Sequence, residues 1–226
     1  KFMAYFQANT NTSAPIEKLK ECFEPFINKD DCIGLSIATR SDAITDECLD
    51  YLEDISKRTY LILELGLQTI HDKTSKLINR CSTLENFDNM VKKLKERNIN
   101  VVVHIINGLP YETEEMMIET VKHLNTLNID GIKIHMLAVL KDTPLEKYYY
   151  KNKFKILTKD EYINIVIKQL EYLNPKIVIH RLTEDPDPNT LIEPKWLIKK
   201  IDILNNIDKI MSQRNIYQGD KEKENV

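Results

Sequence analysis

The chain has few of the residues that mark a metal site or a secreted protein. Its 226 residues include four cysteines, which stand singly at positions 22, 32, 48 and 81. No two of them have the close spacing of a zinc or iron–sulfur motif. A disulfide framework is not expected in a chain of this length without a secretion signal. We therefore expect a reduced, cytoplasmic protein whose cysteines are packing residues.

The chain also lacks an excess of charge and a long apolar run. Its formal net charge is −3 and its pI is near 6.0, so charge does not favour a nucleic acid or an anionic membrane as partner. No apolar run reaches the roughly 20 residues that span a bilayer. Hydrophobic residues make up 42% and charged residues 30%, as in ordinary globular proteins. The length suits one sizeable domain.

The glycine-rich fingerprints of nucleotide-binding open sheets are absent as well, because neither GxGxxG nor GxxxxGK[ST] occurs. Strand and helix patterns instead alternate along the chain, which predicts parallel βαβ units. The expected strands are residues 2–7, 32–39, 60–68, 101–106, 131–137 and 177–182. We expect an α/β fold, a partial (β/α)6 TIM-like barrel of parallel strands over residues 1–182. Residues 183–217 would add a loop and a helix packed on the barrel, and residues 218–226 a disordered tail.

The stretch Tyr60–Arg80 organises this prediction. Leucines alternate with Ile62, Glu64, Gly66 and Gln68, so one face of the strand is apolar and the other is sparse and polar. A buried glutamate is costly unless it has partners. The polar face either lines a functional cavity or belongs to an ordinary buried strand with two hydrogen-bonded polar residues.

Polar residues gather near the carboxyl ends of the other expected strands too. They are Gln7 and Asn9, Thr39 and Arg40, Glu64 and Gln68, His104 and Asn107, Lys133 and His135, and His180 and Arg181. Ligands of α/β folds bind at this edge of the sheet. Each residue also has an ordinary explanation: a strand histidine can be a satisfied core residue, Gln68 can tie down a loop, and Arg40 can pair with Asp42 on the surface.

The order of five motifs resembles the radical S-adenosylmethionine (SAM) superfamily. The motifs are YFQANTNT, GLSIATRSD, LELGLQTIHDKTSKLINR, HIINGLPYET and IKIHMLAVLKDTPL. The resemblance is closest to bacterial proteins described as predicted Fe–S oxidoreductases of unknown substrate, and more distant to the oxygen-independent coproporphyrinogen oxidases. In that family these motifs follow the second to sixth strands of a six-stranded partial barrel. The resemblance covers most of the chain through about Pro144.

The resemblance implies an enzyme with two cofactors, SAM and a 4Fe-4S cluster held by a CxxxCxxC loop. The cluster cleaves SAM reductively, and the resulting radical takes a hydrogen atom from a substrate that the sequence does not identify. A donor such as flavodoxin or ferredoxin would supply the electron. This chain opens with a strand already under way and has no CxxxCxxC. We expect a C-terminal portion that lacks the first strand and the cluster loop, binds no metal and is inactive alone.

Family positions carry over one by one. Gln7, Ala8, Asn9 and Thr10 match a GGxT-like segment that receives the methionyl amine of SAM. Arg40 matches a position that meets the methionyl carboxylate. Because Ala38 stands where the coproporphyrinogen oxidases have a glutamate, we expect Glu64 of the next strand to bind the ribose.

The later motifs contribute further expected cofactor contacts. Gln68 matches a glutamine near the cofactor, and His104 falls where the coproporphyrinogen oxidases have an aspartate. Asn107 and Gly108 belong to the loop of the GLP motif. Met136 and Ala138 match the segment that flanks the adenine.

Two other classes compete with the radical enzyme. His104, His135 and His180 on successive strands, with Glu64, could hold a catalytic zinc or a similar ion. A non-catalytic binding scaffold would show no cofactor affinity at all.

Overall fold

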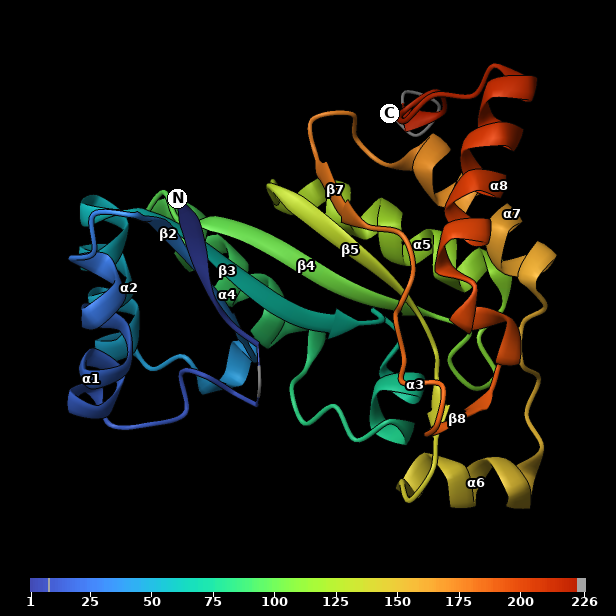
Figure 1. The fold of residues 1–226 in the computed structure, drawn as a ribbon, viewed down its shortest axis with the longest axis horizontal. Coiled ribbons are helices and arrows are strands. Elements are labelled where there is room, and N and C mark those ends of the chain that lie inside the picture. The colour runs from blue at the N-terminus through green and yellow to red at the C-terminus, as the bar shows by residue number, and fades with distance from the viewer. Residues whose placement is uncertain (8, 223–226) are drawn as a thin grey trace. The chain divides into compact units, whose positions relative to one another are not determined.

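The computed structural model describes residues 1–7 and 9–222, and Figure 1 shows its fold. One sheet joins six strands in the order β1, β2, β3, β4, β5, β7. Their bounds are Phe2–Phe6, Cys32–Thr39, Tyr60–Gln68, Asn100–Asn107, Gly131–Met136 and Val178–Arg181. The strands are parallel and follow one another across the sheet in chain order. The expected α/β fold, a partial (β/α)6 TIM-like barrel, is confirmed.

Helices follow the strands in turn. They are α1 (Ile16–Ile27), α2 (Asp46–Arg58), α3 (Asp72–Leu77), α4 (Leu84–Glu96), α5 (Glu114–Leu124), α6 (Pro144–Asn152), α7 (Lys159–Tyr172) and α8 (Lys200–Arg214). Short 3-10 turns cover Ser41–Ala43, Asn125–Leu127 and Lys195–Ile198. Threonine hydroxyls cap α2, α4, α5, α6 and α7 by accepting a backbone N–H of the first turn. Thr158 and Glu161 form a capping box at the start of α7.

The chain divides into two compact units. Unit 1 comprises Lys1–Leu67, Asn79–His104 and Leu127–Gly131. Within it α1 and α2 lie side by side next to β1 and β2 (Figure 1). The ring of Phe6 packs edge-on against Phe23 and Phe26 at centroid distances of 4.8 and 5.5 Å. The four alternating leucines of β3 are all buried in the core of this unit, as the period of two predicts.

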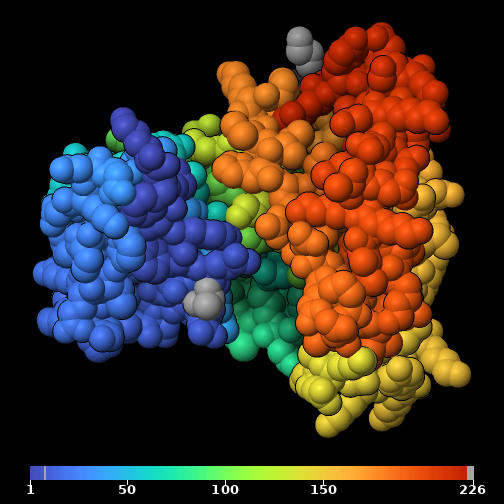
Figure 2. Space-filling model, viewed as in Figure 1, coloured from blue at the N-terminus to red at the C-terminus, as the bar shows by residue number. Residues whose placement is uncertain are grey.

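Unit 2 comprises Gln68–Ile78, Ile105–Thr126 and Ile132–Val226. Figure 2 shows a face of this unit that its C-terminal segments, coloured orange and red, cover. Tyr162 of α7 is fully buried, donates its hydroxyl to Leu182 O at 2.8 Å and packs against the Trp196 ring. Two short strands that the sequence does not predict, β6 (Val139–Leu140) and β8 (Leu191–Glu193), pair antiparallel.

The last described residues differ from the expected disordered tail. Gly219 N donates to Leu170 O, and Lys221 N donates to Glu171 O. Gln218 Nε2 donates to the carbonyls of Asn174 and Ile177, which follow α7. Carbonyls near a helix C-terminus lack helical partners, and this segment supplies them. The segment is therefore ordered as far as residue 222, while residues 223–226 lie outside the described residues.

Across the described ranges 1–7 and 9–222, no helix is both long and apolar enough to cross a membrane.

Candidate functional site

A buried carboxylate with three donors lies at the centre of unit 1. Glu64 on β3 is only 4% exposed. Its Oε1 accepts from Ser36 Oγ at 2.7 Å, and its Oε2 accepts from Tyr5 Oη at 2.9 Å and pairs with His104 Nε2 at 2.8 Å. These side chains come from four adjacent strands, β1 to β4. Because a buried charge without partners is costly, this network explains how β3 tolerates a glutamate.

Strand register puts this carboxylate beside a position that the family resemblance singles out. Ala38 of β2 and Glu64 of β3 are direct register partners in the parallel pair. Where the coproporphyrinogen oxidases have a glutamate at the position of Ala38, this chain has a carboxylate on the neighbouring strand. Because the side chain of Ala38 is small, the carboxylate on this part of the two strands is that of Glu64.

The loop after β1 has a backbone conformation that usually requires glycine. Asn9 has φ = 65°, in the left-handed region that asparagine tolerates better than most residues. Asn11 Nδ2 holds the loop by donating to Phe6 O at 3.0 Å and to Ala38 O at 2.8 Å. The loop thus keeps a glycine-like bend without a glycine. Gln7 and Asn9 are exposed and Thr10 is half-buried, whereas Ala8 lies outside the described residues.

Arg40 has the ordinary partner that the sequence analysis names as the alternative to a cofactor contact. Its guanidinium donates to both carboxylate oxygens of Asp42, at 2.9 and 2.5 Å. This pairing raises the pKa of Arg40 and lowers the pKa of Asp42. The pair is largely open to solvent, so it contributes little to stability.

Arg80 is a candidate site residue that the strand-end pattern does not point to. Its Nη1 donates to Leu67 O at 2.6 Å and its Nε donates to Ser82 O at 3.0 Å. The guanidinium therefore lies at the carboxyl end of β3, a few residues along that strand from Glu64. In the sequence, only its place as the last residue of the motif LELGLQTIHDKTSKLINR indicates that Arg80 belongs near this strand.

In unit 2, the turn after β3 is strained and tightly held. Gln68 has φ = 62° and is half-buried, and Thr69 after it is 0% exposed. Thr69 Oγ1 donates to Glu112 Oε1 at 2.6 Å and accepts from His71 N at 3.1 Å. The turn that carries Gln68 is thus fastened to the loop that follows β4.

Three expected cofactor residues of unit 2 make packing contacts in the structure. Asn107 and Gln169 exchange two amide hydrogen bonds, of 2.7 and 2.9 Å, in a fully buried pair. Gly108 has φ = 79°, and an added Cβ would meet the Met136 side chain at 2.9 Å. Met136 itself is 2% exposed. These residues join β4 and β5 to α7 and to each other, while Ala138 is half-buried before β6.

The histidines do not form the alternative metal site. His104 pairs with Glu64 in unit 1, and His135 pairs with Glu184 in unit 2. His180 is exposed on β7. Within the described part of the chain, no three His, Cys, Asp or Glu side chains are grouped so that they could hold a metal ion. The described residues therefore do not support a metal site built on these histidines.

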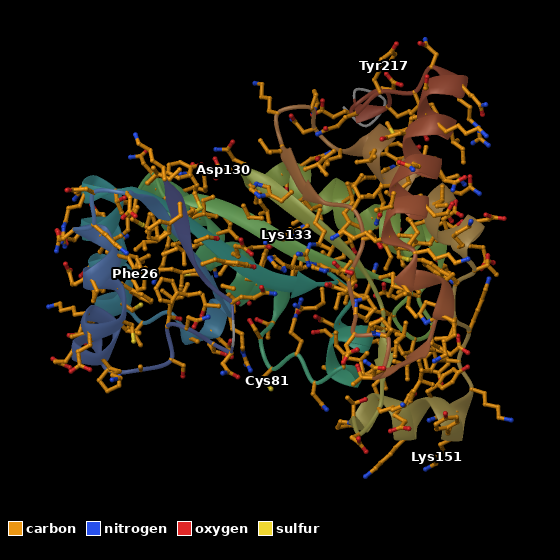
Figure 3. All side chains as sticks on the ribbon, in the orientation of Figure 1. Phe26, Cys81, Asp130, Lys133, Lys151 and Tyr217 are labelled. Carbon is orange, nitrogen blue, oxygen red and sulfur yellow. The ribbon has the colours of Figure 1, made fainter. Side chains whose placement is uncertain are left out.

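Glu184 is instead the centre of an ion-pair cluster in unit 2. Burial alone would raise its pKa, but its hydrogen bond to His135 and the charges of His135 and Arg181 lower the pKa to about 2. Lys133, which Figure 3 labels, is 8% exposed. It is two residues from His135 on β5 and therefore lies on the same face of the strand. This cluster is a charged region among the apolar elements of unit 2.

Comparisons with known proteins identify the family. The sequence model described as "Radical SAM superfamily" matches residues 9–124, and that described as "Radical_SAM C-terminal domain" matches residues 129–213. The Bacillus subtilis protein YtqA is 46% identical over 219 residues, which are 97% of this chain and 68% of YtqA. The chain belongs to the radical SAM superfamily.

Solved structures share the fold. Elp3 of the archaeon Methanocaldococcus infernus, without its residues 1–46, superposes with a TM-score of 0.83 at 18% identity. The match covers 96% of this chain and 55% of that one, so the chain spans little more than half of this relative. The Escherichia coli coproporphyrinogen III oxidase HemN, a radical SAM enzyme, gives a TM-score of 0.51 at 20% identity, over 93% of this chain and 40% of HemN.

The two cofactors of this family fit the chain differently. Cys48 is buried, and burial raises its pKa to about 11, while Cys22 and Cys81 are exposed singly (Figure 3 labels Cys81). The described cysteines thus do not fit an iron–sulfur cluster. SAM carries hydroxyls, an ammonium and a carboxylate. The Glu64 carboxylate, the carbonyls of the loop after β1 and the Arg80 guanidinium of unit 1 have the matching chemistry.

Proposed function

We propose that the full-length protein is a cytoplasmic radical SAM enzyme and that this chain supplies its SAM-binding barrel. The Glu64 network is the main support for the proposal. In a chain of this family, side chains from β1, β2 and β4 hold the Glu64 carboxylate of β3 in one orientation. A carboxylate held by three donors cannot rotate away, so it is a preorganised acceptor for a ligand hydroxyl.

Each contact is assigned by its chemistry. Glu64, steadied by Tyr5, Ser36 and His104, accepts the ribose hydroxyls. The backbone carbonyls of the loop at Asn9 and Thr10 receive the methionyl ammonium. The Arg80 guanidinium is the group that pairs best with a carboxylate, and we assign it to the methionyl carboxylate in place of Arg40. Gln68 contacts the cofactor as the family resemblance implies.

We further propose that the cluster ligands are residues outside this chain, because its own cysteines do not fit a cluster. A small electron-transfer protein such as flavodoxin or ferredoxin would supply the electron for reductive cleavage of SAM. The chain of 226 residues alone would then bind no cluster and cleave no SAM.

The test uses the full-length protein, purified without oxygen and with its cluster rebuilt. SAM and dithionite are added, and 5′-deoxyadenosine and methionine are measured by chromatography. We expect both products, and we expect neither from the chain of 226 residues alone. Conversion of the cluster cysteines to alanine in the full-length protein should abolish the products. A cluster-loaded protein that binds SAM, yet forms no 5′-deoxyadenosine with or without cell-extract substrates, would contradict the proposal.

A further inference from the structure

Two loops of unit 2 share one strained junction. Gln68 has a left-handed backbone (φ = 62°), which is unfavourable for a residue with a side chain. In the loop after β4, Glu112 N donates to Leu109 O at 3.1 Å and closes a turn whose third residue, Tyr111, has φ = 67°. That turn position ordinarily requires glycine. Such conformations persist only where neighbouring contacts enforce them.

Glu112 is the contact common to both turns. Its backbone closes the turn after β4, and its carboxylate accepts from Thr69 Oγ1 in the turn after β3 at 2.6 Å. The hydroxyl of Thr69 in turn accepts from His71 N, so its donor and acceptor capacities are both used. The ring of His71 is fixed as well, by a contact of 2.9 Å between its Nε2 and Met116 O. These hydrogen bonds therefore restrain the side chain of Thr69, the residue next to Gln68.

The position of the Glu112 carboxylate disfavours its ionised form. Burial raises the pKa of Glu112, although the hydroxyls of Thr69 and Thr74 and the charge of His71 act in the opposite direction. An exposed glutamate in the same loop would avoid this cost but could not reach the buried Thr69 hydroxyl. A half-buried carboxylate at a strained turn is typical of a residue that serves a functional site.

We propose that Glu112 is a positioning residue that holds Thr69, and through Thr69 the backbone of Gln68, in the orientation from which Gln68 contacts SAM. This inference rests on the proposed function, which assigns Gln68 to the cofactor. Glu112 acts through Thr69 and touches neither SAM nor the substrate.

The experiment measures the dissociation constant of SAM by equilibrium dialysis, using the full-length protein with its cluster rebuilt. Thr69→Val keeps the shape of the buried side chain and removes its hydroxyl, while Glu112→Ala removes the same contact from the other side. Each should raise the dissociation constant about tenfold, the effect of releasing one restraint of this kind. Thr69→Ser and Glu112→Gln keep a hydrogen bond and should restore the affinity. Hydrogen exchange should show faster exchange at the His71 amide in the two disruptive variants only.

The controls separate this inference from the proposed function. Glu115→Ala removes an exposed carboxylate of the same segment and should leave the SAM affinity unchanged. If the unaltered protein binds no SAM, the proposed function fails, and this inference fails with it. If it binds SAM and Thr69→Val and Glu112→Ala bind equally well, only the inference is overturned. Glu112→Gln binding as weakly as Glu112→Ala would also overturn it, because the hydrogen bond would then not be the cause.

Discussion

Glu64 stands on a strand whose neighbours each contribute one donor to it. Removal of the carboxylate takes away the acceptor that Tyr5, Ser36 and His104 share, and the loss is largest for the buried Ser36 hydroxyl. We predict that Glu64→Ala lowers the free energy of unfolding by about 3 kcal/mol, measured by urea denaturation at neutral pH. Glu21→Ala, which removes only a surface partner of Lys18, should cost less than about 0.5 kcal/mol. Equal losses in the two variants would show that the Glu64 network does not stabilise the fold.

The pKa of Glu184 predicts a pH dependence of stability. Its pKa is about 2 in the folded chain, against an ordinary value of 4.5. A lowered pKa means that the folded state favours the ionised form, so this contribution is complete above about pH 4.5 and is lost as pH falls towards 2. Glu184→Gln should therefore destabilise the chain at pH 6, and the difference from the unaltered chain should shrink on acidification.

Urea denaturation of both proteins between pH 6 and about pH 2.5 measures this difference. Asp208→Asn, at an exposed position of α8, serves as the control and should show no such trend. A difference that stays constant over this range would mean that Glu184 and His135 do not form the pair described here.

Strand alternation determines which way the expected site residues of β4 and β5 point. His104 and Asn107 are an odd number of residues apart on β4, so they point to opposite faces. His104 reaches Glu64, and Asn107 therefore faces α7, where it meets Gln169. Met136 likewise lies opposite Lys133 and His135 on β5. The sequence shows this alternation. Proximity to the carboxyl end of a strand does not by itself show to which face of the sheet a side chain points.

The Asn107–Gln169 pair predicts a strong coupling between β4 and α7. Asn107→Ala leaves Gln169 with only its hydrogen bond to Met117 O, and Gln169→Ala removes both amide contacts of this pair from Asn107, whereas the double change removes both amides together. We expect the loss of unfolding free energy in the double variant to be smaller than the sum of the single losses by about 1–2 kcal/mol. Urea denaturation of the three variants gives this coupling energy. Additive losses would show that the two amides stabilise the fold independently.

Other elements were predictable because their signals are local. The alternating leucines of β3, the capping threonines and the box at Thr158 and Glu161 depend only on near neighbours in the chain. The pair β6 and β8 could not be predicted, because strands of two and three residues carry no alternation. The partners of Glu64 are also non-local: Tyr5 lies 59 residues away, and only the sheet register brings them together.

In the whole molecule, each unit contains some of the expected cofactor-binding residues. In each unit, hydrogen bonds within that unit hold these residues in place. Unit 1 contains the Glu64 network and Arg80, and unit 2 contains the clamped turn at Gln68. Neither contains a group of cysteines that fits the cluster of this family among the described residues. The chain covers 68% of YtqA, and the experiments on activity therefore use the full-length protein.

We propose that this chain binds SAM through the Glu64 network. The most direct measurement is the dissociation constant of SAM for the full-length, cluster-loaded protein, compared between the unaltered protein, Glu64→Gln and the surface control Glu21→Gln. Thermal unfolding of each variant identifies any loss of fold. We predict SAM binding that Glu64→Gln weakens about tenfold and Glu21→Gln leaves unchanged, because a charged hydrogen-bond acceptor for the ribose is lost. Equal affinity in all three proteins, or no SAM binding by the folded unaltered protein, would contradict the account.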